Sequence, residues 1–245
     1  MNANVSENNV IVDEATVQPN IKEKEKVEVR KVLYKVVKRG IDILGGLVGC
    51  VLLVPITVAV YIARKVLKED DGPMFYEQLR IGKNGKEFRF FKYRSMVMNA
   101  DEKLKEYLDE NEDARLEYAK YKKLKNDPRI TKLGEFLRKM SIDEFPQFIN
   151  VLKGDMSLVG PRPYLHREIK DMGDNYDIIV SVKPGLTGYW QVNGRSETDF
   201  ETRMKMDIDY IHDRTLWGDT KFLIKTFLKI FVKEKPTSTV KAIYI

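Results

Sequence analysis

The sequence predicts a mainly helical α+β protein with one N-terminal membrane helix, a small β-hairpin and interfacial amphipathic helices. Residues 41–62 carry a single charge, Asp42, and about 20 apolar residues are enough to cross a bilayer. The pair Asn84-Gly85 separates two runs of alternating apolar and polar residues, which predicts a hairpin. Between residues 217 and 233 lysines recur every four positions beside aromatic and aliphatic side chains, which indicates an amphipathic helix.

The composition favours a globular protein with anionic partners. The chain has 245 residues, of which 43% are hydrophobic, so it can bury a core, and its formal net charge is +6. Phosphates, nucleotides and anionic lipids fit this charge. We expect no nucleic acid, because zinc-ligand spacings, known binding motifs and dense Lys/Arg tracts are absent from the sequence. The single cysteine, Cys50, excludes an internal disulfide and fits a reducing compartment.

Changes in composition divide the chain into four parts. Residues 1–34 are polar and lack a clean period, which predicts a leader that is disordered or weakly helical. Residues 35–69 hold the predicted membrane helix, residues 70–235 form the main domain, and residues 236–245 are a C-terminal tail.

The flanks and the middle of the membrane helix argue against a simple span. Basic residues stand on both sides of it: Lys35, Lys38 and Arg39 before, and Arg64, Lys65 and Lys68 after. The positive-inside rule therefore favours the cytoplasm at both ends. Pro55 lacks a backbone donor and is expected to kink the helix. We predict a re-entrant helix that enters and leaves the same leaflet; a straight single pass and a buried core helix are the alternatives.

The second strand of the hairpin carries two cations on one face. Lys92 and Arg94 are separated by one residue, so their side chains point the same way. Such a pair indicates either a solvated face or an anion site. After the hairpin, residues 99–125 are highly charged and predict an exposed helical excursion, and residues 131–140 predict a short helix.

Two adjacent carboxylates, Asp143 and Glu144, stand where a further helix is expected to begin. One interpretation is structural, because Ser141-x-x-Glu144 has the pattern of a capping box. Pro146 argues for a later start, since proline is tolerated only in the first turn. In either case both acids meet the positive end of a helix, which favours their ionised forms, and Gly154 is a suitable C-terminal cap.

Two basic turns and one acidic residue complete the candidate site. Arg162 is held between Pro161 and Pro163, and a second turn, which follows a short strand, ends on Arg195. A fixed guanidinium suits a phosphate or carboxylate partner. Asp207 lies in a predicted helix, residues 199–213, facing either inward or into solvent. The helix at 217–233 either lies in a membrane interface or packs on the core as an ordinary amphipathic helix.

The chain has only two histidines, His166 and His212, which excludes a metal site built from several histidines. Any metal must be held by oxygen ligands, and such ligands favour Mg²⁺, with Mn²⁺ as the alternative.

Three ordered blocks resemble a known family. They are GPMFYEQLRIGKNGKEFRFFKYRSM from Gly72, DPRITKLGEFLRKMSIDEFPQFINVLKGDMSLVGPRP from Asp127, and KPGLTGYWQVNGR from Lys183. Together they are similar to the bacterial sugar transferases, the monotopic polyprenyl-phosphate phosphoglycosyl transferases. The likeness runs from about Lys35 to about Lys233.

The resemblance implies a reaction and roles for these residues. The family transfers a sugar 1-phosphate from a UDP-sugar to polyprenyl phosphate, usually undecaprenyl phosphate, and releases UMP, at the start of exopolysaccharide, capsule or other glycoconjugate synthesis. Asp143 is implied to be the nucleophile that forms a covalent phosphosugar intermediate, with Glu144 assisting by proton handling or by shaping the metal site. It also implies phosphate, nucleotide or metal contacts, for which the residues are Lys92, Arg94, Arg162, Arg195 and Asp207.

The resemblance also implies the surroundings of the enzyme. The expected cofactor is Mg²⁺, held by Asp143 and Asp207, and the expected partners are the UDP-sugar donor, the lipid acceptor and membrane lipid. The expected location is the cytoplasmic face of the bacterial cell membrane. Homo-oligomerisation and the identity of the sugar stay open.

Two departures from the family pattern stand out. Family members commonly carry Ser-Pro at the bend of the membrane helix, whereas Val54 precedes Pro55 here. Longer relatives carry several membrane helices before the catalytic part, so we expect this chain to be a catalytic unit with little N-terminal addition. The competing hypothesis is a membrane-anchored, non-catalytic binding or scaffolding module.

Overall fold

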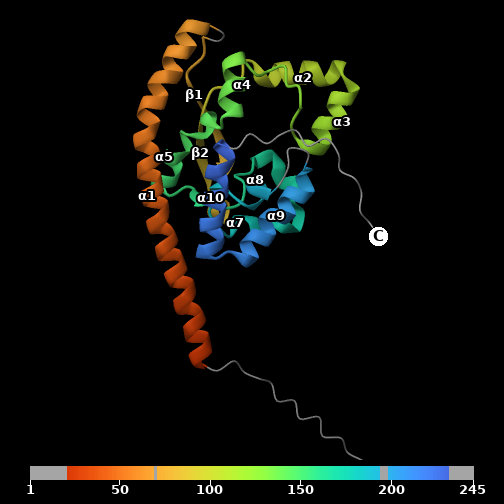
Figure 1. Ribbon diagram of the computed structural model, residues 1–245. Helices are drawn as coiled ribbons and strands as arrows, with labels where there is room; N and C mark the ends of the chain where they lie inside the picture. The colour runs from red at the N-terminus through yellow and green to blue at the C-terminus, as the bar shows by residue number, and fades with distance from the viewer. Residues whose placement is uncertain (1–20, 69–70, 194–197, 232–245) are drawn as a thin grey trace, which may run out of the picture.

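The computed structural model describes residues 21–68, 71–193 and 198–231 (Figure 1). The predicted C-terminal tail, the start of the predicted leader and Arg195 lie outside these ranges. The predicted class is confirmed: the chain is mainly helical, with small sheets and one long apolar helix near its start.

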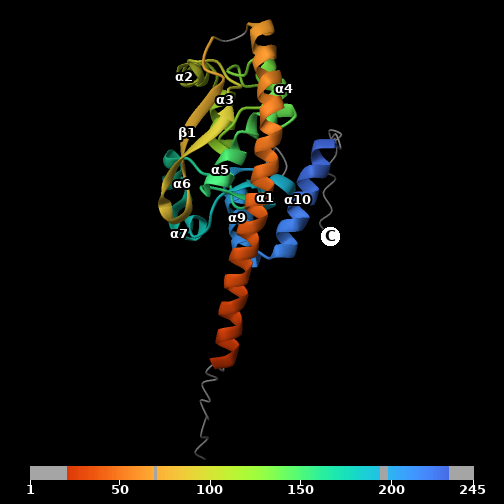
Figure 2. The same ribbon diagram turned by 90° about the vertical axis from the view of Figure 1, so that its left-hand side faces the viewer.

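The long helix α1 (Ile21–Leu67) runs along one side of the whole domain (Figures 1 and 2). It begins at Ile21, so residues 21–34 of the leader predicted to be disordered or weakly helical form its first turns. Among the described residues it is the one helix whose length and composition suffice to cross a membrane, with a mean hydropathy of 2.6 in its most apolar window. Little of that window is buried inside the protein, so α1 is a helix with a large exposed apolar surface.

One face of α1 packs on the domain through glycines. A Cβ atom at Gly49 would lie 2.2 Å from the ring of Phe148, and one at Gly46 would lie 2.9 Å from the side chain of Leu152. Phe148 and Leu152 both lie in α5 (Gln147–Lys153). Because Gly46 and Gly49 carry no side chains, α1 and α5 can approach each other closely. Leu53 and Val60 continue this contact face and are buried.

The re-entrant turn expected at Pro55 is not seen in α1. The helix passes through Pro55 without interruption, and Figure 1 shows it curving along the domain without turning back. The Thr57 hydroxyl donates to the carbonyl oxygen of Leu53 (2.6 Å) and pairs with the hydroxyl of Tyr93 (2.5 Å). The segment around the proline is therefore tied to the hairpin.

The cations and the acid at the start of the apolar stretch are used inside the fold. Arg39 donates to the carbonyl oxygens of Val151 and Leu152, at 2.8 and 2.9 Å, and so caps the C-terminus of α5. Asp42 is buried and accepts from the hydroxyl of Ser157 at 2.9 Å. These residues anchor α1 to the domain, and their charges are therefore poor indicators of membrane orientation.

The predicted hairpin is confirmed. Strands β1 (Phe75–Ile81) and β2 (Glu87–Tyr93) are antiparallel and joined through the short 3-10 helix η1 (Lys83–Gly85). Asn84 and Gly85 adopt positive φ angles of 58° and 74°, a conformation that these two residue types accept most easily.

A second, parallel pair of strands lies deeper in the domain. It joins β3 (Ser157–Val159) to β4 (Gly185–Thr187). β4 is the short strand predicted in the second basic turn. The residues after it form a short helix instead of a turn, α8 (Tyr189–Asn193).

The predicted charged excursion is a helical pair, α2 (Ala100–Glu110) and α3 (Glu112–Tyr121). It stands to one side of the domain (Figure 1) and has its own small apolar cluster of Leu104, Ala114 and Leu124. The remaining elements follow in chain order: α4 (Lys132–Lys139), η2 (Ile142–Glu144), η3 (His166–Glu168), α6 (Ile169–Met172), η4 (Gly173–Asn175), α7 (Tyr176–Val180), α9 (Phe200–Asp213) and α10 (Leu216–Phe231).

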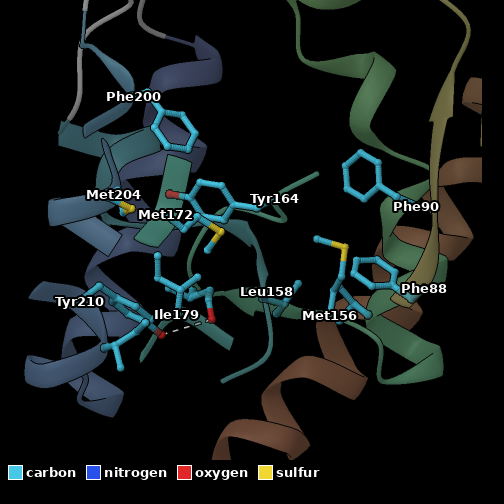
Figure 3. Close-up of a cluster of buried hydrophobic side chains, with 13 residues drawn as sticks. Phe88, Phe90, Met156, Leu158, Tyr164, Met172, Ile179, Phe200, Met204 and Tyr210 are labelled. Atoms are coloured by element: carbon cyan, nitrogen blue, oxygen red, sulfur yellow. Dashed lines mark hydrogen bonds between the residues drawn. The ribbon is translucent and has the colours of Figure 1, made fainter. Parts of the chain in front are cut away.

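The main core lies between the hairpin and α9. Figure 3 shows Phe88 and Phe90 of the hairpin on one side, Phe200, Met204 and Tyr210 of α9 on the other, and Leu158 of β3 between them. Helix α10 adds Phe222 and Leu223 to this core. Its outer surface still exposes apolar side chains, namely Trp217, Ile224, Phe227 and Leu228. One face of α10 therefore packs on the core, as one alternative predicted, and a membrane interface at the exposed apolar face stays a prediction.

Candidate active site

Asp143 and Glu144 lie on the 3-10 turn η2, between α4 and α5. Ser141, before the turn, has φ 54°, and its side chain caps nothing. The capping-box interpretation is therefore wrong for the Asp-Glu pair. Pro146 directly precedes α5, as the tolerance of proline at helix starts requires.

The turn is held in place by an apolar cluster shared with α1 and the hairpin. Leu53 and Val60 of α1, Tyr93 of β2 and Leu137 of α4 are buried together, and Ile142 and Phe145 pack against them. The residues on either side of the pair thus point into this cluster. Asp143 is 5% exposed, and the shared cluster places the candidate site beside the middle of the apolar helix.

Lys92 joins the two carboxylates. Its Nζ donates to Glu144 Oε1 at 2.7 Å and lies 3.7 Å from Asp143 Oδ2. Lys92 reaches the pair because strand alternation puts it on the same face as Phe90, whose ring lies 5.4 Å from Nζ. The sequence placed Lys92 in the site, and the structure brings it against both acids.

The two acids have different electrostatic environments. Burial raises the pKa of Asp143, and the nearby Lys92 charge opposes this only in part. Burial also raises the pKa of Glu144, but the charge and hydrogen bond of Lys92 outweigh it, so that pKa lies below its ordinary value. A helix end was expected to favour the ionised form of Asp143; burial acts in the opposite direction and raises its pKa above the ordinary value.

The Arg162 side chain forms an ion pair with the buried Glu168 and acts on Glu144 through its charge. Its guanidinium lies 3.3 Å from Glu168 Oε1 and 5.5 Å from the ring of Tyr164. It is also close enough to Glu144 to contribute to the lowered pKa of that carboxyl. Arg94 is less central: its Nε donates to the carbonyl oxygen of Pro73 at 2.8 Å, and its guanidinium lies over Tyr76.

Asp207 supports the Arg162 loop. Its carboxylate is fully buried and its Oδ2 accepts from the Arg162 backbone N–H at 3.1 Å and from the Tyr164 hydroxyl at 2.8 Å. Burial raises the pKa of Asp207 to about 7. The contacts described for Asp207 are with this loop and not with Asp143. Asp207 therefore positions the loop that carries Arg162.

The side-chain oxygens around the site decide whether a magnesium ion fits. Within residues 21–68, 71–193 and 198–231, no three His, Cys, Asp or Glu side chains form a group suited to a metal. Mg²⁺ typically uses one or two protein carboxylates together with substrate phosphates, and Asp143 with Glu144 offers such a pair. The adjacent pair suits this ion better than the predicted combination of Asp143 with Asp207.

Three further arginines surround the site and were missed from the sequence. Arg138 donates to the Ser95 hydroxyl at 2.9 Å and lowers the pKa of Asp143. Arg80 and Arg203 lie near Arg162: burial, with the repulsion of Arg162, lowers the pKa of Arg80 to about 10. The spacing of Arg138, five residues before Asp143, was a usable signal, whereas nothing in the sequence links Arg80 to Arg203.

This arrangement has the chemistry of a phosphoryl-transfer site. It combines a buried carboxylate, a lysine in contact with that carboxylate and a fixed arginine nearby. Cations placed around a reacting phosphate stabilise the charge that develops there. A carboxylate is an established nucleophile toward phosphorus.

Comparison with known proteins agrees with this chemistry. The chain is similar to the undecaprenyl-phosphate galactose phosphotransferase of Salmonella typhimurium, with 48% identity over 189 residues, which are 77% of this chain and 39% of that protein. It is 36% identical to the UDP-glucose:undecaprenyl-phosphate glucose-1-phosphate transferase of Escherichia coli over 208 residues, 82% of this chain and 41% of that protein. The exopolysaccharide production protein ExoY of Rhizobium meliloti is 38% identical over 189 residues, 77% of this chain and 83% of that protein.

This chain therefore spans about two fifths of the first two relatives and most of the third. The family model described as "Bacterial sugar transferase" matches residues 33–233, which include α1 from Leu33 onward, the hairpin and the Asp143–Glu144 turn. The chain belongs to the bacterial sugar transferase family.

Proposed function

We propose that this chain transfers a sugar 1-phosphate from a UDP-sugar to polyprenyl phosphate, most simply undecaprenyl phosphate, and releases UMP. The observation that carries the proposal is the buried Asp143 carboxylate 3.7 Å from the Lys92 ammonium, on the turn that bears Glu144. The names of the relatives from Salmonella typhimurium and Escherichia coli support the same class of reaction. The product would begin assembly of an exopolysaccharide, capsule or other glycoconjugate.

The reaction proceeds in two displacements. In the first, an Asp143 carboxylate oxygen bonds to the phosphorus that carries the sugar, and the bond from that phosphorus to the UMP oxygen breaks, so UMP leaves with the electron pair. In the second, a phosphate oxygen of the lipid bonds to the same phosphorus and the aspartyl bond breaks. The lipid diphosphate sugar is released and the Asp143 carboxylate is restored.

The neighbouring residues assist at defined atoms. Lys92 Nζ opposes the pKa increase that burial imposes on Asp143, and thereby favours the ionised nucleophile. Glu144, with its lowered pKa, stays ionised and is available to take a proton from the incoming lipid phosphate. Arg162 is positioned for the diphosphate of the donor. Mg²⁺, held by Asp143 and Glu144, would neutralise diphosphate oxygens.

The packing of α1 supports a position on the membrane surface, and the cytoplasmic face is proposed from the family resemblance alone. The domain contacts α1 from Lys38 to Val60, which covers most of the apolar stretch. If that stretch crossed a bilayer, the docked domain would have to enter the hydrocarbon with its charged surface, which is strongly unfavourable. A helix lying along the surface instead places its outer apolar face in lipid, with the exposed apolar residues of α10 as a second contact.

The experiment for this function uses the full chain in detergent with magnesium and undecaprenyl phosphate. UDP-galactose, UDP-glucose and their N-acetylated forms are supplied in turn, and UMP release is measured. At least one donor is expected to give UMP, and without acceptor the intact mass of the protein is expected to increase by one sugar phosphate. Absence of UMP release with every donor would favour the non-catalytic scaffolding alternative.

A further inference from the structure

A buried polar cluster connects α1 and α10 with the loop that carries Arg162. Asp219 of α10 is buried and accepts from Lys38 Nζ at 2.7 Å and from the Tyr34 hydroxyl at 3.0 Å, both on α1. Its other oxygen accepts from the Tyr210 hydroxyl of α9 at 2.8 Å. In this cluster, the Lys38 and Asp219 side chains are only 18% and 8% exposed.

The same cluster holds the backbone at the start of the loop. The carbonyl oxygen of Val159 accepts from Lys38 Nζ at 2.9 Å and from the Tyr210 hydroxyl at 3.2 Å. Figure 3 shows the second of these bonds as a dashed line at the lower end of the core. Val159 ends β3, and Gly160-Pro161-Arg162 follows directly.

Helix α9 then holds the loop at a second point. Asp207 lies three residues before Tyr210, so both side chains leave the same face of the helix. The Tyr210 hydroxyl has one proton, which it shares between Asp219 Oδ1 at 2.8 Å and the carbonyl oxygen of Val159 at 3.2 Å, and Asp207 accepts from the backbone N–H of Arg162. Pro161 restricts the backbone between these two points, and β4 holds the same segment, because Gly160 donates to the carbonyl oxygen of Thr187 at 2.9 Å and Pro161 accepts from Gly185 at 2.8 Å, so the contact at Val159 is one of several that position Arg162.

We propose that Lys38 is a positioning residue: by joining α1 and α10 to the carbonyl oxygen of Val159, it sets the Arg162 guanidinium beside the Asp143–Glu144 pair. Lys38 therefore acts on the donor through Arg162, and docking of the membrane-facing helices is coupled to donor binding. The inference rests on the proposed function only in assigning the donor diphosphate to Arg162. The position of the loop itself is a separate, measurable property.

The first experiment measures that position by hydrogen exchange in the full chain. In Lys38→Met, the amides of Gly160 and Arg162 are expected to exchange at least about tenfold faster, because local opening becomes easier. The hairpin amides of residues 75–93 are expected to keep their wild-type rates. Lys31→Met is the matched control, because Lys31 lies on the same helix and makes an exposed ion pair with Glu28. Unchanged loop exchange, or an equal increase throughout the chain, would overturn the proposal.

The second experiment tests coupling to Arg162 with UDP as the probe, titrated into the full chain with magnesium. Lys38→Met and Arg162→Met are each expected to weaken UDP binding about tenfold, and the double variant is expected to match Arg162→Met within about twofold. A double variant weakened by the product of the two single losses would mean that Lys38 doesn't act through Arg162. If Lys38→Met fails to fold, Tyr210→Phe replaces it in the cycle, because it removes one donor to Val159 and keeps the ring.

Together the two experiments distinguish failure of the proposed function from failure of the positioning role of Lys38. If the wild-type chain doesn't bind UDP while loop exchange still depends on Lys38, the proposed function is wrong and the positioning role stands. If UDP binds and turnover is normal while Lys38→Met changes neither exchange nor affinity, the positioning role is wrong and the function stands.

Discussion

The two sides of the site place an aspartate in opposite settings. Asp143 lies on a short turn beside α1, with a lysine ammonium 3.7 Å away. Asp207 lies inside the domain on α9, where its Oδ1 has no hydrogen-bond partner and its Oδ2 binds the Arg162 loop. Both carboxyls have raised pKa values because both are buried; Asp143 has an ion pair with Lys92, whereas the charges of Arg162 and Arg203 act on Asp207 without a described ion pair. This difference is why we propose reaction at Asp143 and support at Asp207.

The largest effect is expected from removing the proposed nucleophile, Asp143. Asp143→Asn is expected to lower UMP formation at least about 1,000-fold while the chain still folds, because the amide is a poor nucleophile. UMP release and the mass of the intact protein are the measurements. Glu135→Gln, an exposed change on α4, is the matched control. Substantial turnover by Asp143→Asn would assign the reaction to another residue.

The next effect comes from the lysine that distinguishes the two aspartates. Lys92→Met is expected to lower kcat/KM about 100-fold, since one preorganised charge at such a site contributes that order. Lys92 lowers the pKa of both Asp143 and Glu144, so its removal raises both values. The acid limb of the pH profile of kcat/KM is therefore expected to move to higher pH. If the acid limb does not move, Lys92 does not control the pKa values of Asp143 and Glu144.

A third prediction concerns the contact that brings α1 to the reactive side. Gly49→Val is expected to destabilise the protein by about 1–3 kcal/mol, because the new side chain collides with Phe148 at the α1–α5 contact. Gly40→Ala on the same helix is the control, since a Cβ there has nothing within 4 Å, and it is expected to be neutral or stabilising by up to about 1 kcal/mol. Thermal unfolding in detergent measures both. Equal melting temperatures for the two variants would mean that α1 is not docked at Gly49.

Counted per pH unit, the smallest effect concerns the supporting side. The folded pKa of Asp207, about 7, lies above its ordinary value of 3.8, so the folded state binds an extra proton between these pH values. The free energy of unfolding should therefore fall as pH rises from about 4 to about 7, by at most about 1.4 kcal/mol per pH unit from this group. Asp207→Asn is expected to remove this slope. Denaturant unfolding across that range checks it, and a slope retained in the variant would assign it to other groups.

Much of the site was predictable because its residues are close in sequence. The Asp143–Glu144 pair, the Pro-Arg-Pro turn and the Asn84-Gly85 hairpin are local patterns with direct physical meaning. Lys92 was also placed in the site, though its contact with both carboxylates crosses more than 50 residues of sequence and depends on the packing of β2 against η2. Arg80 and Arg203 were missed because they meet Arg162 only in the folded chain.

The sequence by itself determined the fold class, the hairpin, the apolar helix and the acidic pair, since periodicity, turn chemistry and adjacency are properties of neighbouring residues. The tertiary structure decided which of these charges are buried. It buried Asp143 and so raised its pKa, turned Asp207 toward the Arg162 loop, and used Lys38, Arg39 and Asp42 to anchor α1 to the domain. Burial and long-range contacts change the energy of a charge far more than its neighbours in sequence do, so these roles were set only when the chain folded.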